Sequence, residues 1–331
     1  MAVSQFIYAV ARIRALENNL LDRATYERLL AEDANGVLRL VRETEYAEAF
    51  NDIEQPWDFE RGLDNEQNRI LTLLEKLTDN DRAIQLLRIG YDFYNLKILM
   101  VEKITGETQE QSLCHVGKLM VDDLKKILAE EHPDLPDYLQ QTYHKAIIAI
   151  EKEITTSEVA AMVDREMWKF LQNEYDKLSN EFLTQLFQKQ IDFVNIRTFL
   201  RLKDQVTDQE LLAENLIDDG TLGVKFFQEL YSEPWDIFFR QLQFKNYEDL
   251  VSKGLASWPE DRSLWQYERT VDDHLLKLLA KTKLIYFGVE ALIAYYYFKK
   301  IEMMMLRTIF VGKINGLPDK AINERLRINH V

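Results

Sequence analysis

The feature that most constrains this chain is an internal repeat. Three segments align without gaps: Asp92-Phe-Tyr-Asn95-Leu96-Lys97, Asp192-Phe-Val-Asn195-Ile196-Arg197 and Glu302-Met-Met-Met305-Leu306-Arg307. Eleven residues after each acid stands a lysine, at Lys103, Lys203 and Lys313. On a helix, the acid, the third and fourth residues after it and this lysine lie within about 60° of one direction. The repeat therefore predicts three helices whose marked faces meet the same kind of neighbour.

The spacing of the copies indicates how the chain is organised. The acids are separated by 100 and 110 residues, which divides the chain into predicted units 1–110, 111–210 and 211–331. Solenoid repeats of helices recur every 33 to 47 residues, roughly a third to a half of this period. Three copies of so large a unit favour three domains around a pseudo-three-fold axis over an open solenoid.

The fold class follows from the turn residues and the periodicity. Only 6 prolines and 11 glycines occur in 331 residues, and no run alternates as a strand would. We expect an all-α protein with a turn at Asn35-Gly36. The predicted helical runs are about 66–76, 82–102, 116–131, 138–178, 181–203, 222–230, 235–242 and 264–313. The apolar stretch Leu284 to Phe298 falls short of the ~20 residues of a membrane span, so it predicts a buried core helix.

The repeated polar residues have two interpretations. They could be catalytic acids lining a channel, or they could satisfy buried backbone groups and pair with neighbouring cations. A set that recurs three times specifies packing more readily than three active sites, so the structural interpretation is favoured. The predicted fold-specifying positions are Asp92, Asn95, Lys103, Asp192, Asn195, Lys203, Glu302 and Lys313.

Motifs of enzymes and cofactor sites are missing from the sequence. The pairs Gly117-Lys118 and Gly312-Lys313 lack the upstream glycine of a phosphate-binding loop. The aspartate pairs that begin at Asp122, Asp218 and Asp272 lack the third carboxylate of a D-D-x-x-D magnesium cluster. The five histidines show no helical pairing typical of a zinc site. The sequence therefore predicts no catalytic residue, no cofactor and no metal.

Charge narrows the choice of partners. The net charge of −15 disfavours nucleic acid and bare anionic lipid. Residues 1–110 carry −8 and residues 111–210 carry −6, whereas the segment from Leu275 to Val331 carries +6. The acidic units are expected either to steer docking onto a basic partner or only to keep the protein soluble. The single cysteine, Cys114, and an N-terminal segment unlike a signal peptide favour a reducing compartment.

Several motifs along the whole chain occur together in one known family. They are the opening Tyr8-x-x-Ala11-Arg12-Ile-Arg14-x-x-Glu17, the three repeats, Phe287-Gly288-x-Glu290 and the ending Leu317-Pro318-x-x-x-Ile322-x-x-Arg325-Leu326-Arg327. In this order they resemble the C subunit of the V/A-type ATPases of bacteria and archaea, the counterpart of the d subunit of eukaryotic V-ATPases. Met305 stands where the first two repeats have asparagine, which argues against a functional requirement for that amide.

The resemblance implies an all-α, funnel-like protein without an active site. A single copy would lie on the cytoplasmic side of the membrane, peripheral to it, as part of a membrane-bound complex. There it would join an axle made of the D and F subunits to a proteolipid rotor ring and transmit torque from the catalytic head. The ion, proton or sodium, and the direction of the ATP chemistry stay open. A helical scaffold that binds other soluble proteins is the alternative interpretation, and an all-α enzyme of another type is a third.

Overall fold

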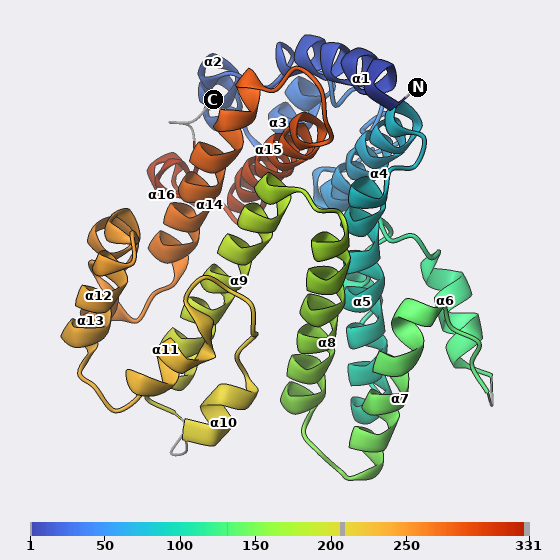
Figure 1. Cartoon of the computed structure of the whole chain (residues 1–331). Helices are drawn as coiled ribbons and strands as arrows, with labels where there is room; N and C mark the ends of the chain where they lie inside the picture. Colours follow the sequence, from blue (N-terminus) through green and yellow to red (C-terminus); the bar gives the residue numbers. More distant parts are fainter. Residues whose placement is uncertain (1, 131, 206–208, 328–331) are drawn as a thin grey trace. The chain divides into compact units, whose positions relative to one another are not determined.

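The computed structural model describes residues 2–130, 132–205 and 209–327 (Figure 1). Within these ranges every regular element is helical and there is no strand, which confirms the all-α prediction. In the same ranges, no helix is both long enough and apolar enough to cross a membrane.

The chain forms two compact units. The first unit combines the two ends of the chain, Met1–Ile84 and Asp249–Val331, and the second is continuous, Gln85–Glu248. The predicted division into 1–110, 111–210 and 211–331, the funnel-like shape and the pseudo-three-fold arrangement stay predictions.

The first unit is built around one long buried helix. Its elements are α1 (Ala2–Glu17), α2 (Arg23–Ala31), α3 (Ala34–Val41), η1 (Pro56–Asp58), α4 (Phe59–Thr78), η3 (Leu250–Gly254), α13 (Trp258–Asp261), α14 (Trp265–Ala280), η4 (Lys281–Leu284), α15 (Glu290–Ile314) and α16 (Asp319–Glu324). Helix α15 packs against α1, α3, α4, α14 and α16. Its apolar residues cover most of its circumference, as expected for a helix enclosed by others.

Both ends of the chain contribute to the core of the first unit. Phe310 of α15 stacks on Phe50 and Phe59 from the N-terminal segment. The same core includes Ile309 and Tyr46, both fully buried. Because stacked aromatic pairs add to the hydrophobic gain of burial, this packing holds α15 to a segment some 250 residues away in sequence.

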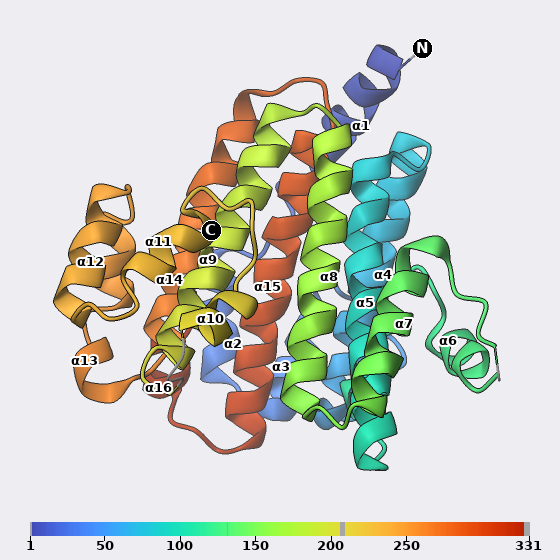
Figure 2. The ribbon, with the colours of Figure 1, turned by 60° about the horizontal axis from the view of Figure 1, so that its bottom comes forward.

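The second unit contains the other two repeat helices. Its elements are α5 (Arg82–Thr105), whose first turn belongs to the first unit, η2 (Glu110–Ser112), α6 (Val121–Leu128), α7 (Asp137–Glu151), α8 (Thr156–Lys177), α9 (Glu181–Leu202), α10 (Gln209–Glu214), α11 (Gly223–Glu229) and α12 (Trp235–Phe244). Helices α7 and α8 pack against each other and run side by side (Figure 2). Aromatic side chains form two clusters in its core: one contains Phe93, Tyr138 and Phe170, and the other contains Phe199, Phe227 and Phe238.

Local capping decides where several helices begin. The Thr155 hydroxyl and the Glu158 side chain form a reciprocal capping box that starts α8. The predicted run 138–178 is therefore two helices and not one, because α7 stops at Glu151. The predicted turn at Asn35-Gly36 is also wrong: Gly36 lies in the first turn of α3, and its N–H donates to the Asp33 side chain.

The predicted helical run 264–313 is interrupted. Helix α14 ends at Ala280 and α15 begins at Glu290, so residues 281–289 form a connector between them. The predicted core helix from Leu284 to Phe298 is therefore correct only from Glu290 onward, where Ala294 is fully buried. Leu284 itself is 79% exposed.

Candidate functional site

The three repeat acids are all buried, and each is held by the same two kinds of donor. One carboxylate oxygen accepts a backbone N–H, and the other accepts a tyrosine O–H. The donors are Leu119 and Tyr138 for Asp92, Leu222 and Tyr247 for Asp192, and Leu21 and Tyr46 for Glu302. Three helices that are distant in sequence thus bind their neighbouring segments in one common manner.

The spacing of these donors shows that the third site is completed by the other end of the chain. Leu119 and Leu222 follow their acids by 27 and 30 residues. The donors of Glu302, Leu21 and Tyr46, come instead from the N-terminal segment. Tyr46 follows Leu21 by the same 25 residues that separate Leu222 from Tyr247. A repeat unit that contains Glu302 must therefore include both ends of the chain.

A glycine allows the backbone to approach each aspartate. Gly117 lies two residues before Leu119, and a Cβ on it would collide with the Asp92 Oδ1. Gly220 has the same relation to Asp192, with the Oδ1 at 2.6 Å from such a Cβ. Any side chain at these positions would displace the carboxylate, so the glycines belong to the acid sites.

The two asparagines bind a second point on the same segments. Asn95 accepts the N–H of Cys114 and donates to its carbonyl, with both distances 2.8 Å. Asn195 makes the same pair of bonds to Ile217, at 2.8 and 2.7 Å. Cys114 and Ile217 lie outside any helix, so their backbone groups need side-chain partners.

The structure also explains the methionine of the third repeat. Cys114 and Ile217 each precede the backbone donor of their site by five residues, and the corresponding residue before Leu21 is Leu16. Leu16 lies within α1, and its carbonyl already accepts the N–H of Asn19. An asparagine at 305 would meet a satisfied backbone, whereas Met305 packs into the core.

The lysines eleven residues after the acids behave differently from one another. Lys203 donates to the carbonyls of Leu230 and Tyr231, just after α11. Lys313 donates to the Leu30 carbonyl in the last turn of α2. Both lysines thus satisfy carbonyls at the end of a short helix, which the helix itself leaves unpaired. Lys103 is exposed.

A further position, three residues before each acid, distinguishes the three sites. It holds Ile89, Lys189 and Lys299. The Lys299 Nζ lies 2.8 Å from the Glu302 Oε2 and 3.8 Å from the centre of the Tyr46 ring. The Lys189 Nζ lies 3.8 Å from the Asp192 Oδ2 and 4.3 Å from the centre of the Tyr247 ring. This position is not among those predicted from the sequence, although the two lysines at one common offset were a signal that could have found it.

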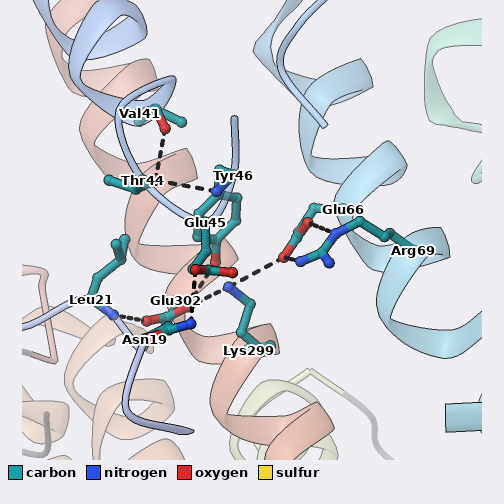
Figure 3. Close-up of polar contacts among 10 residues, drawn as sticks. All are labelled: Asn19, Leu21, Val41, Thr44, Glu45, Tyr46, Glu66, Arg69, Lys299 and Glu302. Carbon is teal, nitrogen blue, oxygen red and sulfur yellow. Dashed lines mark hydrogen bonds and ion pairs between the residues drawn. The ribbon is translucent and has the colours of Figure 1, made fainter. Parts of the chain in front are cut away.

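The site around Glu302 extends into a buried ion network (Figure 3). The Lys299 Nζ also lies 3.3 Å from the Glu66 Oε1 of α4, and Glu66 is in turn bound by two nitrogens of Arg69 at 2.7 and 2.9 Å. Lys299, Glu66 and Glu302 are all at most 3% exposed. Burial and the adjacent Glu302 raise the pKa of Tyr46 well above its usual value, so its hydroxyl remains a donor.

The Asp92 site has no lysine equivalent to Lys299, and the pKa of its acid is raised. Burial raises the pKa of Asp92 to about 6, although the N–H groups of Leu119 and Lys118 and the Tyr138 hydroxyl oppose the shift. The residue three before it, Ile89, supplies no charge. The ionised form of Asp92 therefore bears a cost of burial that the charge of the exposed Lys118 only partly offsets.

These arrangements are suited to holding helices together rather than to catalysis. Each acid is buried and accepts bonds from the protein itself, so its oxygens are not accessible to a substrate. Among the described residues, no group of three His, Cys, Asp or Glu side chains is placed to hold a metal ion. The fold-specifying role of the eight predicted positions stays a prediction that substitutions can test.

Comparisons with known proteins cover almost the whole chain. A family profile with the description ATP synthase (C/AC39) subunit matches residues 9–325. The chain is 23% identical to the C subunit of the A-type ATP synthase of Methanococcoides burtonii, over 98% of this chain and 95% of that protein. It is 26% identical to the protein of the same name from Methanosarcina barkeri, over 98% and 93%. It is 22% identical to the C subunit of the V-type sodium ATPase of Enterococcus hirae, over 95% and 96%.

Proposed function

Because this chain belongs to the ATP synthase C/AC39 subunit family, we propose that it is a central-stalk subunit that links a rotary axle to a membrane rotor ring. As a member of this family it is a subunit of an A/V-type ATPase and not the catalytic chain. In the proposed role, one copy receives the axle made of the D and F subunits and rests on the proteolipid ring. It lies on the cytoplasmic side, peripheral to the membrane.

The observation that carries the proposal is the match over residues 9–325. A match confined to one unit would be compatible with a helical module used for another purpose. Here both units, including the two ends of the chain that form the first unit, fall within the family. The relatives include both an ATP synthase subunit and a sodium ATPase subunit, so the transported ion and the direction of the ATP chemistry stay open.

The geometry of the acid sites supports a role in transmitting force. A subunit that carries torque must deform little under load, so its long helices need ties that resist sliding. Hydrogen-bonded buried groups provide such ties, because breaking one leaves an unsatisfied polar group in the interior. Each repeat helix here is fixed to its neighbouring segment by an acid, and two of the three also by an asparagine.

Purification from native membranes tests the proposal directly. A tagged copy of the chain, expressed from its own locus, is recovered after mild detergent extraction, and the bound proteins are identified. We expect the ring subunit, the axle subunits and the catalytic head in stoichiometric amounts. Recovery of soluble proteins alone would favour the scaffold interpretation. An unrelated tagged protein of similar charge is the control for non-specific retention.

A coupling assay tests the linking role more sharply. Membranes from cells that lack this chain are compared with membranes to which the purified chain has been added back. We expect ATP hydrolysis by the head to persist without the chain, while ATP-driven ion uptake into vesicles is lost. Adding the wild-type chain should restore uptake. Uptake that does not depend on the chain would contradict the proposed role.

A further inference from the structure

The connector between α14 and α15 differs from the link between two long helices of the second unit. The link from α8 to α9 is the tripeptide Leu178-Ser179-Asn180. The connector 281–289 is three times as long and reads Lys-Thr-Lys-Leu-Ile-Tyr-Phe-Gly-Val. A link of this length is not needed between two long helices, because three residues suffice between α8 and α9.

Large apolar side chains of the connector face solvent. Leu284 is 79% exposed, Tyr286 73% and Phe287 61%. Single exposed apolar residues are ordinary on protein surfaces, but three within four positions are not. Their exposure leaves an apolar surface at one end of the first unit that no described residue of the unit covers.

Cations accompany these apolar side chains. Lys281 and Lys283 are exposed on the connector, and Arg12 is exposed on α1. Arg14 of α1 donates to the Thr282 carbonyl at 2.5 Å, which holds the connector against α1. Both views show α1 and the connector at the same end of the unit (Figures 1 and 2).

The local charge is opposite to that of the chain. Residues 2–17 and 275–290 together contain five basic and two acidic side chains, a local +3, although the whole chain carries −15. One of the two acids, Glu17, pairs with Arg14. At physiological ionic strength the field of an exposed charge fades over about 8 Å, so a partner at this end meets the local charge first. The prediction that the net charge disfavours anionic lipid therefore does not apply to this end.

We propose that the connector 281–289, together with the adjoining face of α1, docks on an anionic phospholipid surface. Apolar and aromatic side chains next to lysines suit the boundary between acyl chains and headgroups. Leu284, Tyr286 and Phe287 enter that boundary, and Lys281, Lys283 and Arg12 meet the phosphate groups. This inference goes beyond the linking role and does not depend on it.

Vesicle flotation with the purified full-length chain tests the proposal. Vesicles of phosphatidylcholine alone are compared with vesicles that contain a quarter phosphatidylglycerol. We expect flotation with the anionic vesicles, loss of flotation with the neutral ones, and a decrease with added salt. A chain that stays unbound at every lipid concentration would overturn the proposal, and a partner protein would then be the occupant to seek.

Paired variants separate the two contributions and control for surface apolarity. Tyr286→Ser with Phe287→Ser removes apolar side chains, and Lys281→Gln with Lys283→Gln removes charge, which should each weaken binding about tenfold or more. Phe244→Ser of α12 is the matched control, because Phe244 is 74% exposed but lies in the other unit. We expect no change for this control. An equal loss for Phe244→Ser, or none for either pair, would contradict docking through the connector.

These outcomes are distinguishable from failure of the linking role. The same connector variants are passed through the purification from native membranes. If the wild-type chain does not bind vesicles and the variants no longer recover the ring subunit, the connector contacts protein and the lipid proposal is wrong. If the wild-type chain binds vesicles but recovers no ring or axle subunit, the linking role fails while the lipid proposal stands.

Discussion

The Glu302 site and the Asp92 site accept the same kinds of hydrogen bond from neighbouring segments. They differ in whether a buried lysine neutralises the charge of the acid. Both acids accept a leucine N–H and a tyrosine O–H. At Glu302 a buried lysine adds a full ion pair and extends it to Glu66 on α4. At Asp92 the equivalent position is Ile89, and burial raises the pKa of the acid to about 6.

The Asp192 site lies between these extremes. Lys189 is half-buried, and its Nζ donates to the Tyr247 hydroxyl at 2.8 Å while remaining 3.8 Å from the Asp192 Oδ2. Burial lowers the pKa of Lys189, and the nearby Asp192 opposes that shift. The three repeats therefore share a hydrogen-bond geometry, whereas the neutralising charge is added separately. Substitutions that remove a hydrogen-bond donor or a lysine should therefore change the stability of the fold by different amounts at the three sites.

The largest effect is expected for Lys299→Met. This change leaves Glu66 and Glu302 buried without their shared cation, and breaking a buried ion pair in this way costs about 4 to 5 kcal/mol. The measurement is the free energy of unfolding in urea. The double variant with Glu302→Gln in addition should recover most of the loss, because Glu66 keeps Arg69 as its partner and no unpaired charge remains.

The matched control for Lys299 is a surface pair in the same unit. Arg307 binds Glu60 through two nitrogens, but the side chains are 48% and 51% exposed. Arg307→Met should cost at most about 1 kcal/mol, as exposed pairs do. Equal costs for the two substitutions would mean that the Lys299 network is not a buried charge network in solution.

A somewhat smaller loss is expected for Asn195→Leu. The leucine fills a similar volume but leaves both the N–H and the carbonyl of buried Ile217 unpaired, which should cost about 3 to 4 kcal/mol. Met305→Leu is the corresponding change in the third repeat and should cost under about 1.5 kcal/mol, because it conserves apolar volume. A cost for Met305→Leu as large as that for Asn195→Leu would refute our explanation of why that repeat needs no amide.

The fold class and the family could be predicted from the sequence, because both depend on patterns that recur along the chain. The all-α class follows from helical spacing, and the structure confirms it. The family resemblance rests on motifs spread over the chain, and the match over residues 9–325 confirms it. The reason for Gly117 and Gly220 could be stated only once their approach to the aspartates was known.

Features that depend on contacts between distant segments could not be predicted in the same way. Nothing near Glu302 in sequence indicates that Leu21 and Tyr46 are its donors, because the pairing depends on how the chain ends meet. The sequence predicts continuous helix through the connector 281–289 because the apolar residues there continue the pattern of α15. The structure has only the short 3-10 helix η4 (Lys281–Leu284) there, so the prediction is wrong from residue 285 to residue 289. Hydrophobic periodicity alone does not distinguish a side chain that faces a core from one that faces solvent.

The ionisation of Asp92 should make stability depend on pH. Its pKa in the folded chain is about 6, above the ordinary value of 3.8, so the folded state binds more protons between these pH values. Its contribution is therefore fully present below about pH 4 and is lost as pH rises through 6. Asp92→Asn has no proton to lose, so it should gain about 2 to 3 kcal/mol relative to the wild type between pH 4 and pH 7.

A surface aspartate provides the control of opposite sign. Hydrogen bonds from Lys277 and then Lys253 lower the pKa of Asp249 to about 2. The stability that ionised Asp249 contributes is present above its ordinary pKa and is lost as pH falls towards 2. The free energy of unfolding of Asp249→Asn should therefore decrease relative to that of the wild type as pH rises from 2 to 5. A pH-independent difference for Asp92→Asn, measured by urea unfolding at each pH, would show that Asp92 is not desolvated.

The smallest effect is expected for Tyr138→Phe, which removes one donor from Asp92 and nothing else. The Tyr138 hydroxyl lies 2.8 Å from the Asp92 Oδ2 and opposes the upward shift of that pKa. Its loss should raise the pKa of Asp92 further and cost about 1 kcal/mol at pH 7, because bonds to an ionised acceptor are the stronger ones. At pH 4.5, where Asp92 is protonated, the cost should shrink. Tyr46→Phe is the matched change at Glu302, where Lys299 supplies a second partner, so its cost should not follow the titration of Asp92. If both variants lose the same free energy at both pH values, the two sites do not differ in how they carry charge, and the lysine position is only a packing feature.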